Sequence, residues 1–176
     1  MSRLTCLRSM PLLCLAVFLA SGCASDPSRG YSMDRPFDSE YRSIAVPIIE
    51  NDTYFREVGF NLTDALVKEI QSRTPYKVTG EGGADTVLKG RITDVNLRQL
   101  SKSRNSGLAE EMMYTVTINW EWTDLATGKP IAARQNFSAS AVFMPSRPSS
   151  EPIELGRFEV VQQLASDMVD AMRSDW

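Results

Sequence analysis

Residues 113–124 read MYTVTINWEWTD, and their alternation is the strongest structural signal in the chain. One set of alternate positions is apolar or aromatic throughout: Tyr114, Val116, Ile118, Trp120 and Trp122. The positions between them hold threonine, asparagine and glutamate. A period of two predicts a β-strand with one buried face and one solvated face. Because an apolar face of this size needs a cover, we predict that it forms the core under helices rather than an open groove for a lipid.

The flanking segments extend this strand into a three-stranded meander. Downstream, DLATGK at residues 124–129 predicts a hairpin turn, and residues 131–143 continue the alternation on a return strand. Upstream, residues 84–100 predict a long strand whose apolar positions change parity near Asp94, which indicates a β-bulge. The inward residues that we predict for the return strand are Ile131, Ala133, Phe137, Ala139, Ala141 and Phe143.

Two segments carry helical spacing instead. The first has apolar residues at i, i+4, i+7, i+8 and i+12, which predicts an amphipathic helix that ends near Arg73, before Pro75. Its predicted buried stripe is Val58, Leu62, Ala65, Leu66 and Ile70. A second helix is predicted over residues 155–173. Its predicted buried stripe is Phe158, Val161, Ala165, Met168, Val169 and Met172.

Two shorter strands complete the pattern, at residues 43–49 and 76–79. Pro47 places the first of them at an edge or terminal position. Each helix has one apolar stripe and the clearest strand has one apolar face. We therefore predict an α+β fold in which two helices pack on one face of a mostly antiparallel sheet of about four to five strands.

The N-terminus has the composition of an export signal. Arg3 and Arg8 precede the apolar stretch PLLCLAVFLA, residues 11–20, which is too short to span a bilayer, since a transmembrane helix needs about 20 residues. Small residues then lead into Cys23, an order similar to a bacterial lipobox, in which the cysteine carries lipid after cleavage. We expect a signal peptide over residues 1–22, a lipidated cysteine and flexible tether over residues 23–42, and a folded domain over residues 43–176.

The cysteines agree with this interpretation. Cys6 and Cys14 leave with the signal and Cys23 is acylated, so the domain has no thiol to pair and depends on its core alone. Ala24 is not the aspartate that resembles an inner-membrane retention signal, which favours the outer membrane with the domain facing the periplasm. Removing Arg3 and Arg8 lowers the formal net charge from −3 to −5, and this acidic balance argues against a nucleic-acid partner.

Composition also excludes several enzyme classes. The chain has no histidine, which removes Ser-His-Asp triads, Cys-His pairs and histidine-ligated zinc. Neither a GxxxxGK[ST] nor a GxGxxG phosphate loop occurs. Glu50 and Asp52 follow an apolar strand, as catalytic carboxylates often do, but Asn51, Asp52 and Thr53 are typical of turns and helix caps. We predict a strand-to-helix connection there, and no catalysis, metal or cofactor.

Several segments, taken in order, carry a family resemblance. They are SIAVPIIENDTY at residues 43–54, LTDAL at 62–66, SRTPY at 72–76, Ala84-Asp85, LKGRI at 88–92, Gly128-Lys129 and a last helix running to Trp176. Together they resemble the LPS-assembly lipoprotein family, LptE. Members of that family plug and help assemble the outer-membrane barrel LptD and assist delivery of lipopolysaccharide to the outer leaflet. The resemblance therefore implies a barrel and lipopolysaccharide as partners.

Four cations are candidates for contact with lipid A phosphates, because cationic side chains form charge-assisted bonds to phosphate. They are Arg91, Arg98, Lys102 and Arg104. No acidic residue occurs between Asp94 and Glu110. Phe143 and Met144 could touch the barrel wall, with core packing as the alternative for Phe143. Trp176 is either a helix-end anchor or an interface residue.

A second function remains open at this stage. The segment IAVPIIENDT, residues 44–53, also resembles the first strand and turn of periplasmic lipoproteins that activate penicillin-binding proteins or serve curli-type secretion. A protein of that kind would act by docking on an enzyme or a secretion component.

Overall fold

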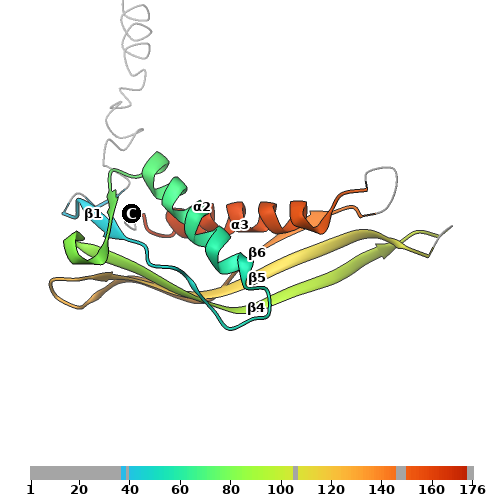
Figure 1. Cartoon of the computed structure of the whole chain (residues 1–176), viewed down its shortest axis with the longest axis horizontal. Helices are drawn as coiled ribbons and strands as arrows, with labels where there is room; N and C mark the ends of the chain where they lie inside the picture. Colours follow the sequence, from blue (N-terminus) through green and yellow to red (C-terminus); the bar gives the residue numbers. More distant parts are fainter. Residues whose placement is uncertain (1–36, 39, 105–106, 146–149, 174–176) are drawn as a thin grey trace, which may run out of the picture. The chain divides into compact units, whose positions relative to one another are not determined.

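Two helices cover one face of a six-stranded sheet in the computed structural model, which describes residues 37–38, 40–104, 107–145 and 150–173. The helices are α2, Glu57–Arg73, and α3, Ile153–Asp170, and both lie on the same side of the sheet (Figure 1). A short 3₁₀ helix, η2, spans Glu81–Gly83. Cys23 and Trp176 lie outside the described residues.

The sheet combines an antiparallel meander with short parallel strands. Its order is β3-β1-β4-β5-β6, and β2 also pairs with β4. The meander consists of β4, β5 and β6, whereas β1 pairs in parallel with β3 and β4, and β2 in parallel with β4. The bounds are β1 Ser43–Ala45, β2 Glu50–Asn51, β3 Lys77–Thr79, β4 Thr86–Lys102, β5 Ala109–Asp124 and β6 Pro130–Phe143.

These observations confirm the α+β class and the mostly antiparallel sheet. The sheet has six strands, because two strands, β1 and β2, occur where the sequence predicted a single strand at residues 43–49. Pro47, which has no N–H to donate, lies between them. The helix predicted before Pro75 is also confirmed: α2 ends at Arg73 and buries all five predicted residues.

The core is the aromatic face of β5 under the two helices. Its five predicted inward residues are each at most 2% exposed: Tyr114, Val116, Ile118, Trp120 and Trp122. Phe143 is also buried, at 2% exposure, so it packs in the core, whereas Met144 is 45% exposed. Burial of side chains this large contributes about 1.5–3 kcal/mol each, which makes this face a large contributor to stability.

The predicted bulge lies in β4. Ile92 pairs with Ile118 and Asp94 with Thr117, so Thr93 is the additional residue. Directly opposed residues of an antiparallel pair share one face of the sheet. Beyond the bulge, Leu97 lies opposite Tyr114 on the helix side.

One predicted core residue of α3 was wrong. Phe158 is 61% exposed, and α3 instead buries Val160 and Leu164 with the other predicted positions up to Val169, while Met172 is buried just beyond the end of the helix. Apolar residues occupy two adjacent stripes at the start of this helix, and periodicity alone does not say which stripe faces the sheet. Gly156 settles the orientation, because its Cα lies against the Phe143 ring and a Cβ added there would be 2.5 Å from Phe143 Cδ1.

The inward assignment of Ala133 was also wrong. Ala133 is exposed, and Ala132 lies opposite Trp122 and packs against the core. The register shifts between Ile118 and Trp120, where β6 holds one residue more than β5. Asn136, at φ 53°, adopts the left-handed conformation there, and its N–H donates to Asn119 Oδ1 at 2.8 Å.

Among the described residues, neither helix has the length and apolar content needed to cross a membrane.

Candidate functional site

The end of the β4–β5 hairpin extends past the helices (Figure 1). We call residues 97–104 and 107–111 the hairpin arm. Every residue from Asn96 to Leu100 is exposed, although β4 and β5 remain paired there. The arm is closed by backbone hydrogen bonds from Ser103 N–H to Leu108 O and from Gly107 N–H to Ser103 O, each 2.9 Å. Gly107 has φ 71°, which explains a glycine in this turn.

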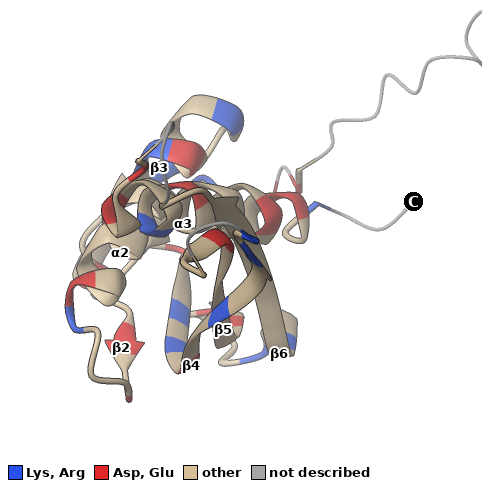
Figure 2. Cartoon of the chain, turned by 90° about the vertical axis from the view of Figure 1, so that its right-hand side faces the viewer, with Lys and Arg blue, Asp and Glu red and all other residues tan. Residues whose placement is uncertain are grey.

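Three of the four candidate cations lie on this arm. Arg98 is opposite Met113 and Lys102 is opposite Ala109, with Arg104 in the turn that follows. All three are exposed, and none forms an ion pair with another described residue. In Figure 2 the basic bands on β4 lie on the lower part of the strand, away from the helices. The arm therefore presents cations that remain available to an anion.

Exposed leucines accompany these cations. Leu97, Leu100 and Leu108 are 39%, 43% and 64% exposed. Single exposed apolar residues are ordinary, but this short arm carries three of them, and Leu97 lies on the helix-side face of β4 while Arg98 lies on the opposite face. These three leucines were not among the functional residues predicted from the sequence. The signal was present in the parity change near Asp94, after which alternation continues into a segment with no predicted cover.

Arg91 lies in a different setting. Its guanidinium pairs with Glu50 at 2.5 Å and with Asp52 at 3.4 Å, because β2 and β4 place Glu50 directly beside Arg91. Arg91 also lines an open cleft of about 450 Å³ on the sheet side of Pro47 and Ile48, together with Lys89 and Glu121. The structure thus groups Arg98, Lys102 and Arg104 and leaves Arg91 apart, already flanked by two carboxylates.

The segment with Glu50 and Asp52 is a turn held by its own side chains. Asn51 Oδ1 accepts from Thr53 N–H at 2.8 Å, and Asn51 Nδ2 donates to Phe55 O at 2.9 Å. The residue that precedes α2 is Arg56, and no side chain caps that helix N-terminus. These residues connect β2 to α2, and both carboxylates serve as partners of Arg91.

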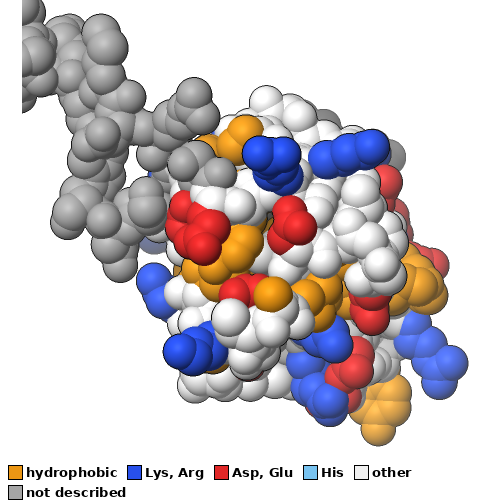
Figure 3. Space-filling model, turned by 90° about the vertical axis from the view of Figure 1, so that its left-hand side faces the viewer, with side chains coloured by type: hydrophobic (Ala, Val, Ile, Leu, Met, Phe, Trp, Pro, Cys, Tyr) orange, Lys and Arg blue, Asp and Glu red, His pale blue; other side chains and the backbone are white. Residues whose placement is uncertain are grey.

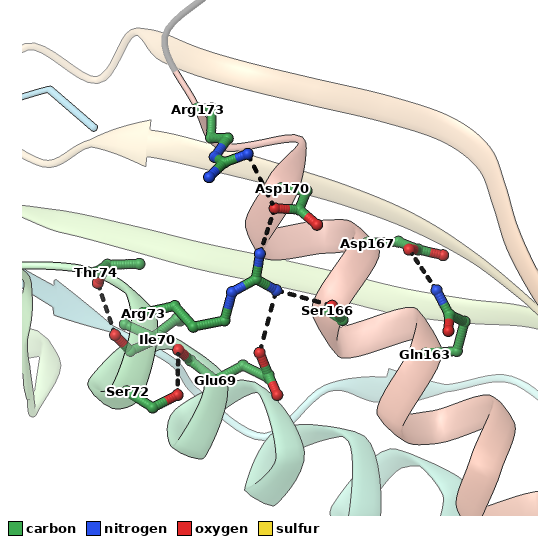
Figure 4. Close-up of polar contacts among 10 residues, drawn as sticks. All are labelled: Glu69, Ile70, Ser72, Arg73, Thr74, Gln163, Ser166, Asp167, Asp170 and Arg173. Atoms are coloured by element: carbon green, nitrogen blue, oxygen red, sulfur yellow. Dashed lines mark hydrogen bonds and ion pairs between the residues drawn. The ribbon is translucent and has the colours of Figure 1, made fainter. Parts of the chain in front are cut away.

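The end that carries the C-termini of both helices is tightly bonded. Arg73 of α2 donates to Glu69 at 3.3 Å, to Ser166 at 2.8 Å and to Asp170 of α3, as Figure 4 shows. Asp170 also pairs with Arg173 at 3.6 Å. We call Phe37, Arg73, Tyr76, Asp170 and Arg173 the helix-end cluster. Figure 3, which views the molecule from the side of β1 in Figure 1, shows acidic and basic side chains interspersed on that face of the molecule.

Aromatic contacts join the start of the described chain to this cluster. Phe37 is 5% exposed, meets the Tyr76 ring edge-on at 6.1 Å, and has the Arg173 guanidinium 5.9 Å above it. Tyr76 donates from its hydroxyl to Asp38 O at 3.0 Å, and burial raises the pKa of Tyr76 to about 12. Tyr41 packs on Trp122 at 5.9 Å. Phe37 and Tyr41, which we assigned to the tether, thus pack against the folded body.

The fold and its arm define a class of protein: a small two-layer α+β domain with an exposed cationic and apolar hairpin. No group of three or more potential metal ligands occurs among the described residues. The chain belongs to the lipopolysaccharide-assembly family, LptE, whose family model matches residues 41–175. No curated protein matches the chain.

Solved structures that align with this chain come from several bacteria. The PelC dodecamer of Paraburkholderia phytofirmans aligns with a TM-score of 0.51 at 16% identity, over 80% of this chain and 96% of that chain. A putative lipoprotein from Caulobacter crescentus gives 0.47 at 16% identity, over 73% and 87%. Lipoprotein GNA1162 from Neisseria meningitidis gives 0.46 at 14% identity, over 73% and 96%. At this identity, the PelC match shows the fold alone.

Proposed function

We propose that this protein is an outer-membrane lipoprotein that plugs and helps assemble an LptD-type barrel and assists delivery of lipopolysaccharide to the outer leaflet. The supporting family match covers residues 41–175. The observation that carries the lipopolysaccharide contact is the hairpin arm, which bears three cations without ion-pair partners among the described residues and also three exposed leucines. Lipid A offers phosphates and acyl chains, and the arm has a matching group for each.

The other face of the sheet suits a polar barrel lumen. The face of β5 and β6 opposite the helices carries Thr115, Thr117, Ser138 and Ser140, and Thr115 and Ser140 share a hydrogen bond of 2.8 Å. Hydroxyl-bearing residues of this kind exchange hydrogen bonds with water or with a polar wall at little cost. The function needs no reaction at this site, and we assign the protein no enzymatic activity.

Attachment to the membrane rests on Cys23. Two or three acyl chains on this residue, at about 0.8 kcal/mol per buried methylene, would hold the protein to the outer membrane and raise its concentration near the barrel. Cys23→Ala is expected to leave a folded domain that no longer fractionates with membranes. Unchanged membrane recovery would overturn the lipid assignment.

The contact with lipopolysaccharide is tested by charge removal on the arm. Replacing Arg98, Lys102 and Arg104 by alanine should weaken binding about tenfold at low salt, given roughly 0.5 kcal/mol for each exposed charge pair, and less at high salt. The matched control replaces Lys77, Lys129 and Arg134, which are also exposed but lie outside the arm. If the two triple variants weakened binding equally, the loss of affinity would follow from the change in net charge alone, which would contradict a site on the arm.

Arg91 is included in the proposal as a weaker contact, because phosphate would have to compete with Glu50 and Asp52. Arg91→Ala should therefore change lipopolysaccharide affinity less than Arg98→Ala does. A larger effect of Arg91→Ala would move the contact to the cleft beside Pro47.

The partner is tested by purifying the full chain from detergent-solubilised membranes. A stoichiometric LptD-type barrel should accompany it, and depletion of the protein should lower lipopolysaccharide at the cell surface. Recovery of a penicillin-binding protein or of a curli-secretion component instead would favour the second function named from the sequence.

A further inference from the structure

The sheet has two long open edges, and they differ in protection. Beyond its pairing with β2, which ends at Ile92, β4 has no further strand neighbour on its outer side among the described residues. That edge carries the Thr93 bulge, a second irregularity between Gln99 and Ser101, and charged residues at Asp94, Arg98 and Lys102. Bulges and charges are the usual devices that prevent a free edge from pairing with another chain.

The outer edge of the second half of β6, residues 137–143, lacks these devices, whereas the first half contains Pro130, Arg134 and the bulge at Asn136. Within the described chain, β6 has β5 as its only strand neighbour, and Figure 2 shows it as the outermost strand of the meander. Residues 137–143 read FSASAVF, without a charge, a proline or a register shift in the pairing with β5. Such a segment presents a regular row of backbone donors and acceptors to any strand that approaches it. We call the outer side of residues 137–143 the β6 edge.

The β6 edge is complementary to itself. In an antiparallel pair centred on Ser140, Phe137 would lie opposite Phe143 of the second copy, and Ala139 opposite Ala141. Ser138 would lie opposite Val142. All helix-side residues then meet helix-side residues, and no like charges are opposed.

The helix beside the edge fits the same arrangement. A groove of about 520 Å³ runs beside β6, lined by Ser140, Phe158, Glu159 and Gln163 among others. Two copies related by a twofold axis at Ser140 would place their α3 helices antiparallel. The exposed ring of Phe158 would gain a cover.

We propose that two copies of this chain, when not engaged with a partner barrel, pair antiparallel through the β6 edge about Ser140. The pairing continues the sheet from one copy into the next and protects its least guarded edge. The pairing does not depend on lipopolysaccharide or on the barrel, so its test is independent of the test of the function proposed above.

A single added cysteine tests the pairing. Opposed residues of an antiparallel pair have Cα atoms about 4.5–5.5 Å apart, which is within the range that a disulfide bridges. The full chain with Ser140→Cys, purified in detergent without the barrel and treated with copper phenanthroline, should give mostly disulfide-linked dimer. The parent protein, without the added cysteine, sets the background.

Register is tested with two further variants. Ser138→Cys leaves its cysteines about 13 Å apart, four residues along the strand, and should stay monomeric. Mixed with Val142→Cys protein, it should give a heterodimer, because residues 138 and 142 are opposed. Equal cross-linking of Ser138→Cys alone and Ser140→Cys would mean random collision and overturn the proposal.

A charge on the edge supplies an independent check. Val142 is 47% exposed, and Val142→Lys should lower the dimer yield of the Ser140→Cys protein at least several-fold while the circular dichroism spectrum is unchanged. A Ser140→Cys protein that is folded yet remains monomeric would refute the pairing. Linkage of the introduced thiol to a different polypeptide would assign the edge to another partner and equally refute it.

Discussion

The hairpin arm and the helix-end cluster contain similar residue types, but these residues have different roles in the two regions. In the cluster, Arg73 bonds with three side chains and Phe37 lies between Tyr76 and Arg173. On the arm, Arg98 has no ion-pair partner among the described residues, and Leu108 is 64% exposed. The first arrangement holds helices together, and the second leaves charged and apolar side chains exposed to a ligand. Substitutions at the two regions should therefore separate stability from binding.

The largest contrast is expected for buried and exposed apolar side chains. Trp122 is 2% exposed and packs between Tyr41 and Tyr76. Trp122→Ala should therefore lower the free energy of unfolding of the protein by about 3–5 kcal/mol. Leu108→Ala should change stability by about 0.5 kcal/mol or less. Urea unfolding followed by tryptophan fluorescence measures both, with circular dichroism for the Trp122 variant. Comparable losses would mean that the arm is part of the cooperative core.

A glycine substitution tests the orientation of α3 on the sheet. Gly156→Ala would place a Cβ 2.5 Å from the Phe143 ring and should cost about 1–3 kcal/mol through overpacking. Gly82→Ala is the control, because a Cβ there meets no atom within 4 Å. Thermal unfolding of the two variants should differ clearly. A neutral Gly156→Ala would mean that the ring moves aside at little cost.

Alanine substitution of one arginine in each region compares their contributions to stability and to binding. Arg73→Ala removes the bonds to Glu69, Ser166 and Asp170 and should lower stability by about 1–2 kcal/mol, a modest figure because the group is partly solvated. Arg98→Ala should leave stability within about 0.5 kcal/mol and weaken lipopolysaccharide binding instead. Chemical denaturation and a lipopolysaccharide pull-down on both variants give the four values. If the folded Arg73→Ala protein lost as much lipopolysaccharide binding as Arg98→Ala does, this would contradict the assignment of stability to the helix-end cluster and of binding to the arm.

The smallest effect under ordinary conditions concerns pH. Burial raises the pKa of Tyr76 to about 12, so the neutral hydroxyl is favoured in the folded state. This contribution to stability is complete below about pH 10, the unfolded value, and is lost as pH rises toward 12. Tyr76→Phe should flatten that decline while leaving the slope near pH 7 unchanged. An identical alkaline profile in both proteins would assign the decline to other groups.

Periodicity predicted the fold well where one face of an element is buried throughout. The alternation of β5 and the stripe of α2 fixed the core because their burial repeats with the period of the backbone. It failed where position depends on a partner element. Ala132, rather than Ala133, faces the core because a bulge in β6 changes the register. Phe158 faces outward because Gly156 is the residue of α3 that packs against Phe143.

The candidate site divides in the same way. Arg98, Lys102 and Arg104 are close in sequence, so their grouping on one arm could be predicted. Their lack of ion pairs with other described residues could not, since it depends on how far the helices reach along β4. Arg91 shows the converse: Glu50 is 41 positions away in the chain, and only the parallel pairing of β2 with β4 brings the two side chains together.

Thr93 marks a position of this strand where a residue can be lost without changing the faces of the others. Upstream of it, even-numbered residues of β4 face the helices, and downstream Val95 and Leu97 do. Because Thr93 is the additional residue, its loss would place Asp94 directly after Ile92 and restore an unbroken alternation, with Leu97 still on the helix side and Arg98 on the opposite face. Loss of a paired residue such as Asn96 would instead point Arg98 under the helices and Leu97 away from them. Alignments of related chains should therefore show a gap at Thr93 far more readily than at Asn96.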